Sequence, residues 1–193
     1  MSAYGSFDQP TYKIDLTTFL PILADGKTHN ITLDVASAEL DHGILGNWYL
    51  SGNIQVITDS SSRPTTGSIL SYSAPPYAKS KTTGSVRRQP DGTDDVDITI
   101  SASHKVEILS KIVTGSGKTK LVNWNQDLSF NSRQSYTQGA NYQVVQQTSS
   151  GTSLSTHNGV PVVTDRFKYP LTVYYNNIAY DNTTGCMDRQ RCG

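Results

Sequence analysis

The chain has 193 residues, enough for one well-buried core, and its 16 Lys and Arg residues equal its 16 Asp and Glu residues. This balance gives no net field that would attract nucleic acid or an anionic membrane, and no run approaches the ~20 apolar residues of a bilayer span. Charged residues (17%) and hydrophobic residues (35%) are both scarce, so the composition is neutral and rich in hydroxyl and amide groups, as in secreted all-β proteins.

The first predicted unit consists of a strand, one helical turn, a tight turn and a second strand. Apolar and polar residues alternate over 12–16, which predicts a half-buried strand. Thr17 or Thr18 can cap a short helical turn that continues to Leu23. Asp25-Gly26 is a tight-turn dipeptide, and alternation over 30–35 predicts the second strand.

The rest of the chain predicts further strands, roughly eight to ten in all. Polar or Gly-rich segments predict a basic loop at 79–88, an acidic turn at 90–95, and links at 114–117, 131–135 and 148–156. Strands are predicted at 48–58, 69–72, 96–100, 106–113, 120–132, 136–148, 160–164 and 166–175. No other segment has a helical period, so we expect an antiparallel β-sandwich forming one domain over 1–180, followed by a C-terminal tail at 181–193.

The tail and two sequons bear on the cellular compartment. Cys186 and Cys192 are the two cysteines, and their spacing allows a small loop disulfide as well as a reduced pair. Asn30 and Asn182 begin Asn-x-Thr sequons, which are glycosylated only in the secretory pathway. The first residues lack the basic start and apolar core of a signal peptide.

The residue order over 4–59 carries a family pattern. Its residues are Phe7-Asp8, Pro10, Tyr12, Ile14-Asp15-Leu16-Thr17, Phe19-Leu20, Leu23, Asp25-Gly26-Lys27, His29 and Trp48. This order resembles the second half of the peptide N-glycosidase A family, the plant and fungal glycoamidases. The resemblance implies two jelly-roll β-sandwich domains, secretion, and an N-glycopeptide or glycoprotein substrate. In relatives this stretch follows a first jelly roll, so we expect Met1 to fall in mid-protein and the missing N-terminal jelly-roll domain to be a partner.

Amide hydrolysis needs groups that activate water, protonate the departing nitrogen and stabilise the oxyanion. Carboxylates supply the first two roles, so Asp8 and Asp15 are the candidate catalytic residues. Tyr12 and Trp48 are candidate platforms for binding sugar rings. Structural readings stand beside these roles: Asp8 can serve a turn between Phe7 and Pro10, Asp15 precedes Leu-Thr-Thr as a helix cap does, and Trp48 begins an alternating strand as a core residue does.

Metal and cofactor chemistry is not expected. The four histidines are scattered without ligand spacing, and no Gly-x-Ser-x-Gly elbow occurs. The segment 115–119 ends like a P-loop but lacks its first glycine, which predicts a hairpin loop instead.

Two functions are therefore predicted. The first is a partial glycoamidase that hydrolyses the amide between Asn and the first N-acetylglucosamine of N-glycans and is inactive without the N-terminal domain. The alternative is a stand-alone, non-catalytic β-sandwich that binds carbohydrate or protein. Neither function involves nucleic acid or a membrane.

Overall fold

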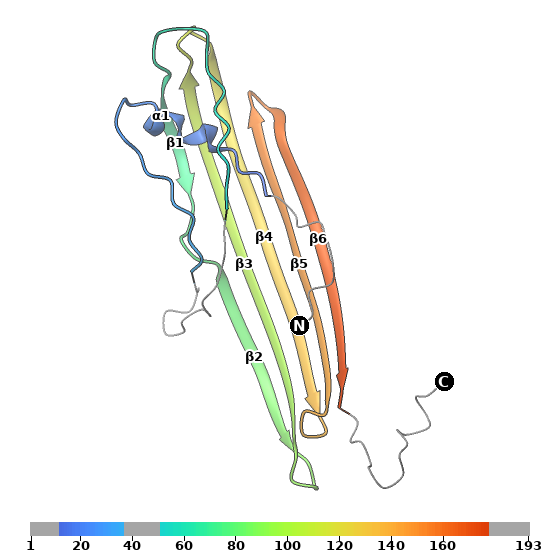
Figure 1. The fold of residues 1–193 in the computed structure, drawn as a ribbon. Coiled ribbons are helices and arrows are strands. Elements are labelled where there is room, and N and C mark those ends of the chain that lie inside the picture. Colours follow the sequence, from blue (N-terminus) through green and yellow to red (C-terminus); the bar gives the residue numbers. More distant parts are fainter. Residues whose placement is uncertain (1–11, 37–50, 178–193) are drawn as a thin grey trace. The chain divides into compact units, whose positions relative to one another are not determined.

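The computed structural model describes residues 12–36 and 51–177 (Figure 1). Asp8, Trp48, Asn182, Cys186 and Cys192 lie outside the described residues. The elements in chain order are η1 (Leu16–Phe19), α1 (Leu20–Leu23), β1 (Thr66–Ser73), β2 (Lys79–Arg88), β3 (Asp94–Val113), β4 (Thr119–Thr137), β5 (Tyr142–His157) and β6 (Val160–Asn176). Among the described residues, neither helix has the length and apolar character needed to cross a membrane.

The strands form one six-stranded sheet in the order β1-β3-β4-β5-β6, with β2 also paired to β3. Both β1 and β2 run antiparallel to β3 and pair with different parts of it: β1 with the segment 107–113, and β2 with the segment 94–103. The all-β, antiparallel class is thus confirmed, whereas the jelly-roll arrangement of two facing sheets stays a prediction.

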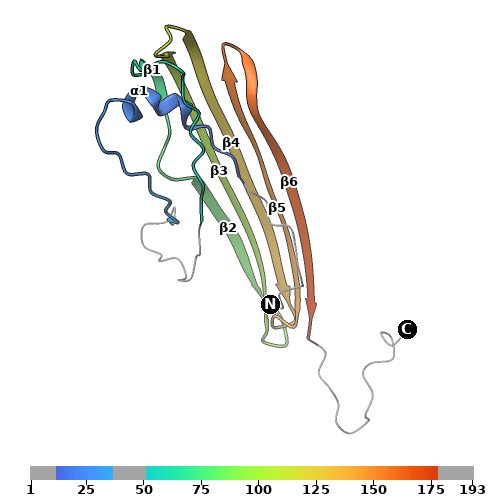
Figure 2. The same cartoon turned by 45° about the horizontal axis from the view of Figure 1, so that its top comes forward.

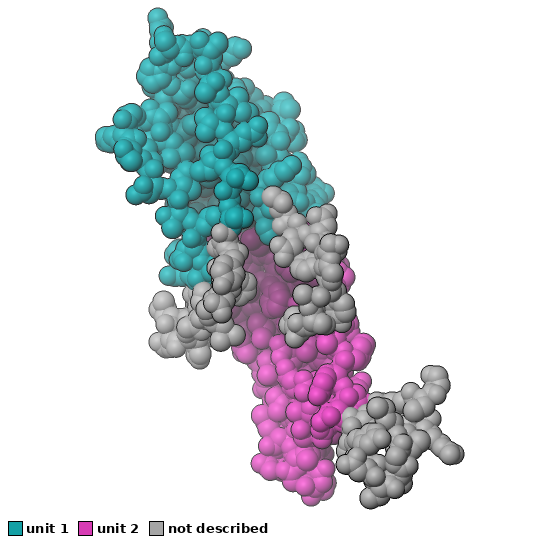
Figure 3. Space-filling model, in the orientation of Figure 1, with its two compact units in different colours: residues 1–77, 105–127, 151–166 teal, residues 78–104, 128–150, 167–193 magenta. Residues whose placement is uncertain are grey.

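The chain divides into two compact units, coloured separately in Figure 3. Unit 1 comprises residues 1–77, 105–127 and 151–166, and unit 2 comprises residues 78–104, 128–150 and 167–193. The extent of the single domain predicted for 1–180 stays a prediction.

Unit 1 holds the hydrophobic core. Alternate residues of a strand face the same side of the sheet, and Ile108, Ser110 and Ile112 of β3 are buried in this way. Val122 and Trp124 of β4 are buried with the same period. These four apolar side chains are the buried hydrophobic residues of the described chain.

The helical turn formed by η1 and α1 packs beside β1, as Figures 1 and 2 both show. The rings of Phe19 and Tyr72 meet edge to face with their centroids 6.5 Å apart. Gly67 of β1 permits the approach of Pro21, because an added Cβ would lie 3.1 Å from the proline ring and 2.2 Å from a backbone oxygen of β3. The Ser110 hydroxyl donates to the Thr18 carbonyl over 2.6 Å, which ties the turn to the sheet.

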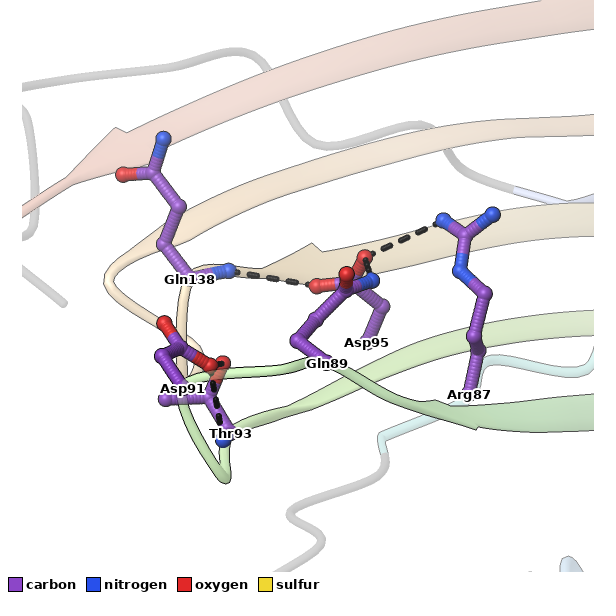
Figure 4. Close-up of polar contacts among 6 residues, drawn as sticks. All are labelled: Arg87, Gln89, Asp91, Thr93, Asp95 and Gln138. Carbon is purple, nitrogen blue, oxygen red and sulfur yellow. Dashed lines mark hydrogen bonds and ion pairs between the residues drawn. The ribbon is translucent and has the colours of Figure 1, made fainter.

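Unit 2 has its best-defined polar cluster where the β2–β3 turn approaches the β4–β5 turn (Figure 4). Asp95 accepts hydrogen bonds from the Arg87 guanidinium at 3.1 Å, from the Gln89 amide and from the Gln138 backbone N–H at 3.3 Å. We call Arg87, Gln89, Asp95 and Gln138 the Asp95 clasp. The clasp joins the ends of two hairpins through Asp95 and Gln138, which are 43 residues apart in sequence.

Three predicted strands are not strands in the structure. Residues 12–15, 30–36 and 51–58 have no strand conformation, and Leu16, predicted as part of the first strand, begins η1 instead. The short helical turn predicted to continue to Leu23 and the Asp25-Gly26 turn are confirmed. Alternation predicts a strand only if a neighbour supplies the backbone hydrogen bonds. Leu33 (58% exposed) and Val56 (75% exposed) show that these segments do not bury an apolar face.

Three predicted loops are strands instead. The basic loop at 79–88 is β2, and the links predicted at 131–135 and 148–156 lie inside β4 and β5. The turn between β4 and β5 falls at 138–141, where Gln138, Gly139 and Ala140 all have positive φ. Their polar composition predicted loops, but a strand whose face is exposed to solvent can consist of polar residues. Such a strand is held by backbone hydrogen bonds to its neighbours.

Candidate functional site

Asp15 forms the N-cap of the first helical turn in unit 1. Its Oδ1 accepts the Thr17 backbone N–H at 2.9 Å and also the Thr17 hydroxyl. The capping interpretation of Asp15 is therefore confirmed, and Asp15, not Thr17 or Thr18, caps the turn.

The other oxygen of Asp15 faces β5. Its Oδ2 accepts the Ser155 hydroxyl and lies 3.3 Å from His157 Nε2. Ser155 and His157 are two residues apart on one strand, so their side chains point to the same side of the sheet. We call Asp15, Thr17, Ser155 and His157 the Asp15 cluster; it joins positions 140 and 142 residues apart.

The electrostatics of this cluster favour an ionised carboxylate. The Asp15 side chain is 11% exposed and that of His157 is 23% exposed. Burial by itself would raise the pKa of Asp15, but hydrogen bonds from Ser155, Thr17 and His157 outweigh it and hold the pKa below its ordinary value. Asp15 is thus a fixed negative charge against an imidazole at neutral pH.

The arrangement limits the chemistry that each group can perform. Four donors surround the Asp15 carboxylate, which suits it to orient His157 rather than to abstract a proton itself. Ser155 bonds the carboxylate and not the imidazole, so the three residues are not arranged as a nucleophilic triad. His157 is the group of the cluster able to exchange a proton with a substrate.

Sequence reasoning missed Ser155 and His157. Ser155 lies in a segment predicted to be a turn, and His157 was one of four scattered histidines. The available signal was the run Ser153, Ser155, His157, which alternates as one face of a strand does; Ser153 and Ser155 are indeed buried.

Of the other predicted site residues, Tyr12 is 60% exposed, and Asp8 and Trp48 lie outside the described residues. Asn30 is exposed in a segment without regular secondary structure, and its glycosylation stays a prediction. Asp25 accepts the Lys27 N–H at 2.9 Å and pairs with His29 Nε2 at 2.8 Å, which matches its predicted turn role. Within residues 12–36 and 51–177, no group of three acidic, histidine or cysteine side chains is placed to hold a metal ion.

Comparisons with known proteins agree on one family. The model described as "Peptide N-acetyl-beta-D-glucosaminyl asparaginase amidase A" matches residues 1–75, and the model described as "PNGase_A C-terminal domain" matches residues 97–171. The two matches together cover more than half of an all-β chain. The chain is therefore a peptide N-glycosidase A-like protein.

A curated relative gives the same indication. The chain is 36% identical over 80 residues, which are 42% of its length, to the peptide-N4-(N-acetyl-beta-glucosaminyl)asparagine amidase A of Prunus dulcis. The match spans 13% of the length of that relative. No solved structure matches the chain.

Proposed function

We propose that this chain is part of a secreted glycoamidase that hydrolyses the amide between Asn and the first N-acetylglucosamine of an N-glycan. The observation that carries the proposal is the match of two models of one family to successive parts of the chain. The name of the Prunus dulcis relative, an amidase acting on N-acetyl-beta-glucosaminyl asparagine, supplies the substrate class. The activity requires the N-terminal jelly-roll domain, without which the chain is inactive.

The reaction adds water to the side-chain carbonyl carbon of the glycosylated Asn and breaks the bond from that carbon to nitrogen. Asp is left in the peptide, and the nitrogen leaves with the sugar as a glycosylamine. His157 is proposed as the proton-transfer group, and Asp15 as the residue that positions its imidazole. Tyr12 and Trp48 remain proposed sugar contacts, and Asp8 remains a proposed catalytic carboxylate.

The test is incubation of the protein with a short N-glycopeptide, followed by mass spectrometry of the peptide. Conversion of the linkage Asn to Asp is expected when the chain is joined to the N-terminal jelly-roll domain and not for the chain alone. His157→Gln removes the conversion, whereas His29→Gln, which changes another carboxylate-paired imidazole of unit 1, leaves it unchanged. Equal conversion by both variants would remove His157 from the mechanism.

A non-catalytic β-sandwich that binds carbohydrate or protein is the second candidate. It is favoured by the complete hydrogen bonding of the Asp15 carboxylate, which is what a purely structural cap requires. Retention of intact glycopeptide without conversion, also in the presence of the N-terminal domain, would support this binding function.

A further inference from the structure

Two adjoining grooves cross unit 2. The first has a volume of about 220 Å³ and the second about 320 Å³, and Asn131 of β4 lines both. The first is lined by residues of β3 to β6, among them Thr99, Asn131, Arg133, Gln146, Gln147 and Leu171. The second is lined by residues of β2 to β4, among them Lys79, Lys81, Ser101, Ser103 and Asn131. Together the grooves extend across strands β2 to β6.

The pairing of β2 with β3 shows how the second groove is built. Lys79 lies opposite Ser103, and Lys81 lies opposite Ser101, and residues directly opposite one another share a face of the sheet. Thr99 follows on the same face by alternation, and it lines the first groove. Short hydroxyl side chains therefore form the floor, with longer lysine side chains beside it.

The lining provides hydrogen-bonding groups that the protein itself does not use. Within the described part of the chain, the side chains of Arg133, Gln146 and Gln147 make no hydrogen bond or ion pair with another residue. No carboxylate lines either groove, whereas Lys79, Lys81 and Arg133 supply three cations. Each amide offers donors and an acceptor side by side, which is what neighbouring sugar hydroxyls require.

We propose that these grooves bind the sugar chain of an N-glycan, which extends the proposed function by assigning glycan recognition to unit 2. The neutral amides and hydroxyls pair with sugar hydroxyls, and the half-exposed Leu171 provides an apolar contact for a ring face. Strands hold these groups at fixed spacing, which reduces the ordering cost of binding. The cations accommodate sugars that carry a carboxylate.

The test is titration of the full chain with free N-glycan oligosaccharides, followed by amide NMR shifts and by calorimetry. A free oligosaccharide has no Asn amide to cleave, so binding is measured separately from amidase activity. One arm uses a neutral glycan and the other a sialylated glycan of the same core. Shifts at Thr99, Asn131 and Gln146 are expected, with the sialylated glycan binding at least as tightly.

Variants place the binding site. The double substitution Asn131→Ala/Gln146→Ala removes two neutral hydrogen-bonding side chains and weakens binding about tenfold or more. Gln55→Ala, which removes an exposed amide outside the grooves, leaves binding unchanged. The proposal would be overturned if the native chain, shown to be folded by a dispersed amide spectrum, bound neither glycan. It would also be overturned if the double variant bound the glycans as tightly as the native chain does. Glycan binding without amide hydrolysis would support the glycan site in the grooves and reject the amidase function. Amide hydrolysis without glycan binding in the grooves would reject only the glycan site.

Discussion

Unit 1 and unit 2 are built from continuous strands of the same sheet, yet they are stabilised differently. Ile108, Ile112, Val122 and Trp124 all lie in unit 1, where the helical turn also packs on β1. Among the described residues of unit 2, no apolar side chain is buried, and β2 is exposed along its whole length. Unit 2 is stabilised by backbone hydrogen bonds between its strands and by the Asp95 clasp. Its polar side chains therefore remain available to contact a ligand.

This difference indicates a division of roles. The Asp15 cluster, for which proton transfer is proposed, is found where packing fixes two segments that are distant in sequence. The grooves lined by hydroxyls and amides are found where side chains remain hydrated and can exchange water for a ligand.

The largest expected effect is the loss of the core in unit 1. Ile112→Ala removes a side chain that is 1% exposed and leaves a cavity, so the free energy of unfolding falls by about 2–5 kcal/mol. Leu171→Ala in unit 2 removes a side chain that is 47% exposed and costs less than about 1 kcal/mol, because no enclosed cavity results. Urea denaturation followed by tryptophan fluorescence measures both values. Equal losses would show that the two units do not differ in packing.

The next effect is expected at Asp15. Asp15→Asn leaves one acceptor oxygen where two oxygens now serve Thr17, Ser155 and His157, and it lowers the free energy of unfolding by about 1–3 kcal/mol. Asp25→Asn is the matched control, since its carboxylate is exposed and pairs with His29 in a similar way. An equal loss in the control would contradict a special role for the buried cluster.

The Asp15→Asn variant also tests how the free energy of unfolding depends on pH. The pKa of Asp15 is lower in the folded than in the unfolded state, so its contribution is complete above the unfolded pKa of about 3.9. The contribution is lost as the pH falls through the lower, folded value. Urea midpoints between neutral pH and about pH 2 should therefore fall more steeply for the native chain than for Asp15→Asn. Parallel curves would show that Asp15 is not linked to folding.

A smaller effect is expected at the Asp95 clasp. Asp95→Asn weakens the contacts with Arg87 and the Gln138 N–H, at a cost of roughly 1 kcal/mol, because Arg87 is largely solvated. Hydrogen exchange of the Gln138 amide should become faster while that of Ile112 is unchanged. Asp91→Asn, which changes the neighbouring turn carboxylate bonded to Thr93, should leave Gln138 exchange unaffected.

The smallest effect has the opposite sign. Thr18 is fully buried, and its Oγ1 has no hydrogen-bond partner in the described structure. Thr18→Val keeps the shape and removes the unpaired hydroxyl, so we expect a gain of up to about 1 kcal/mol. Ser110→Ala, which removes the donor to the Thr18 carbonyl, should lower the stability instead. Thermal denaturation distinguishes the two signs, and a loss for Thr18→Val would indicate an unrecognised partner for the hydroxyl.

Local signals in the sequence predicted the features that need only local interactions. Asp15 before Leu-Thr-Thr predicted a cap, and Asp25-Gly26 predicted a turn, where Gly26 adopts a φ of +81°. The alternation over 96–100 and 106–113 predicted strand, though not that both segments form the single strand β3. The strand expected at 30–35 is absent, as is the described part, 51–58, of the strand expected at 48–58, because alternation does not reveal whether a pairing partner exists.

The sequence by itself determined the all-β class, the short helical turn that ends at Leu23 and the family pattern, because period-2 alternation, capping residues and residue order are local properties of the chain. The tertiary structure decided which carboxylate lies against a histidine and which strands share a polar groove. The contact between Asp15 and His157, 142 residues apart, arises from the packing of the helical turn against the sheet, and no local pattern reveals which residues that packing brings together.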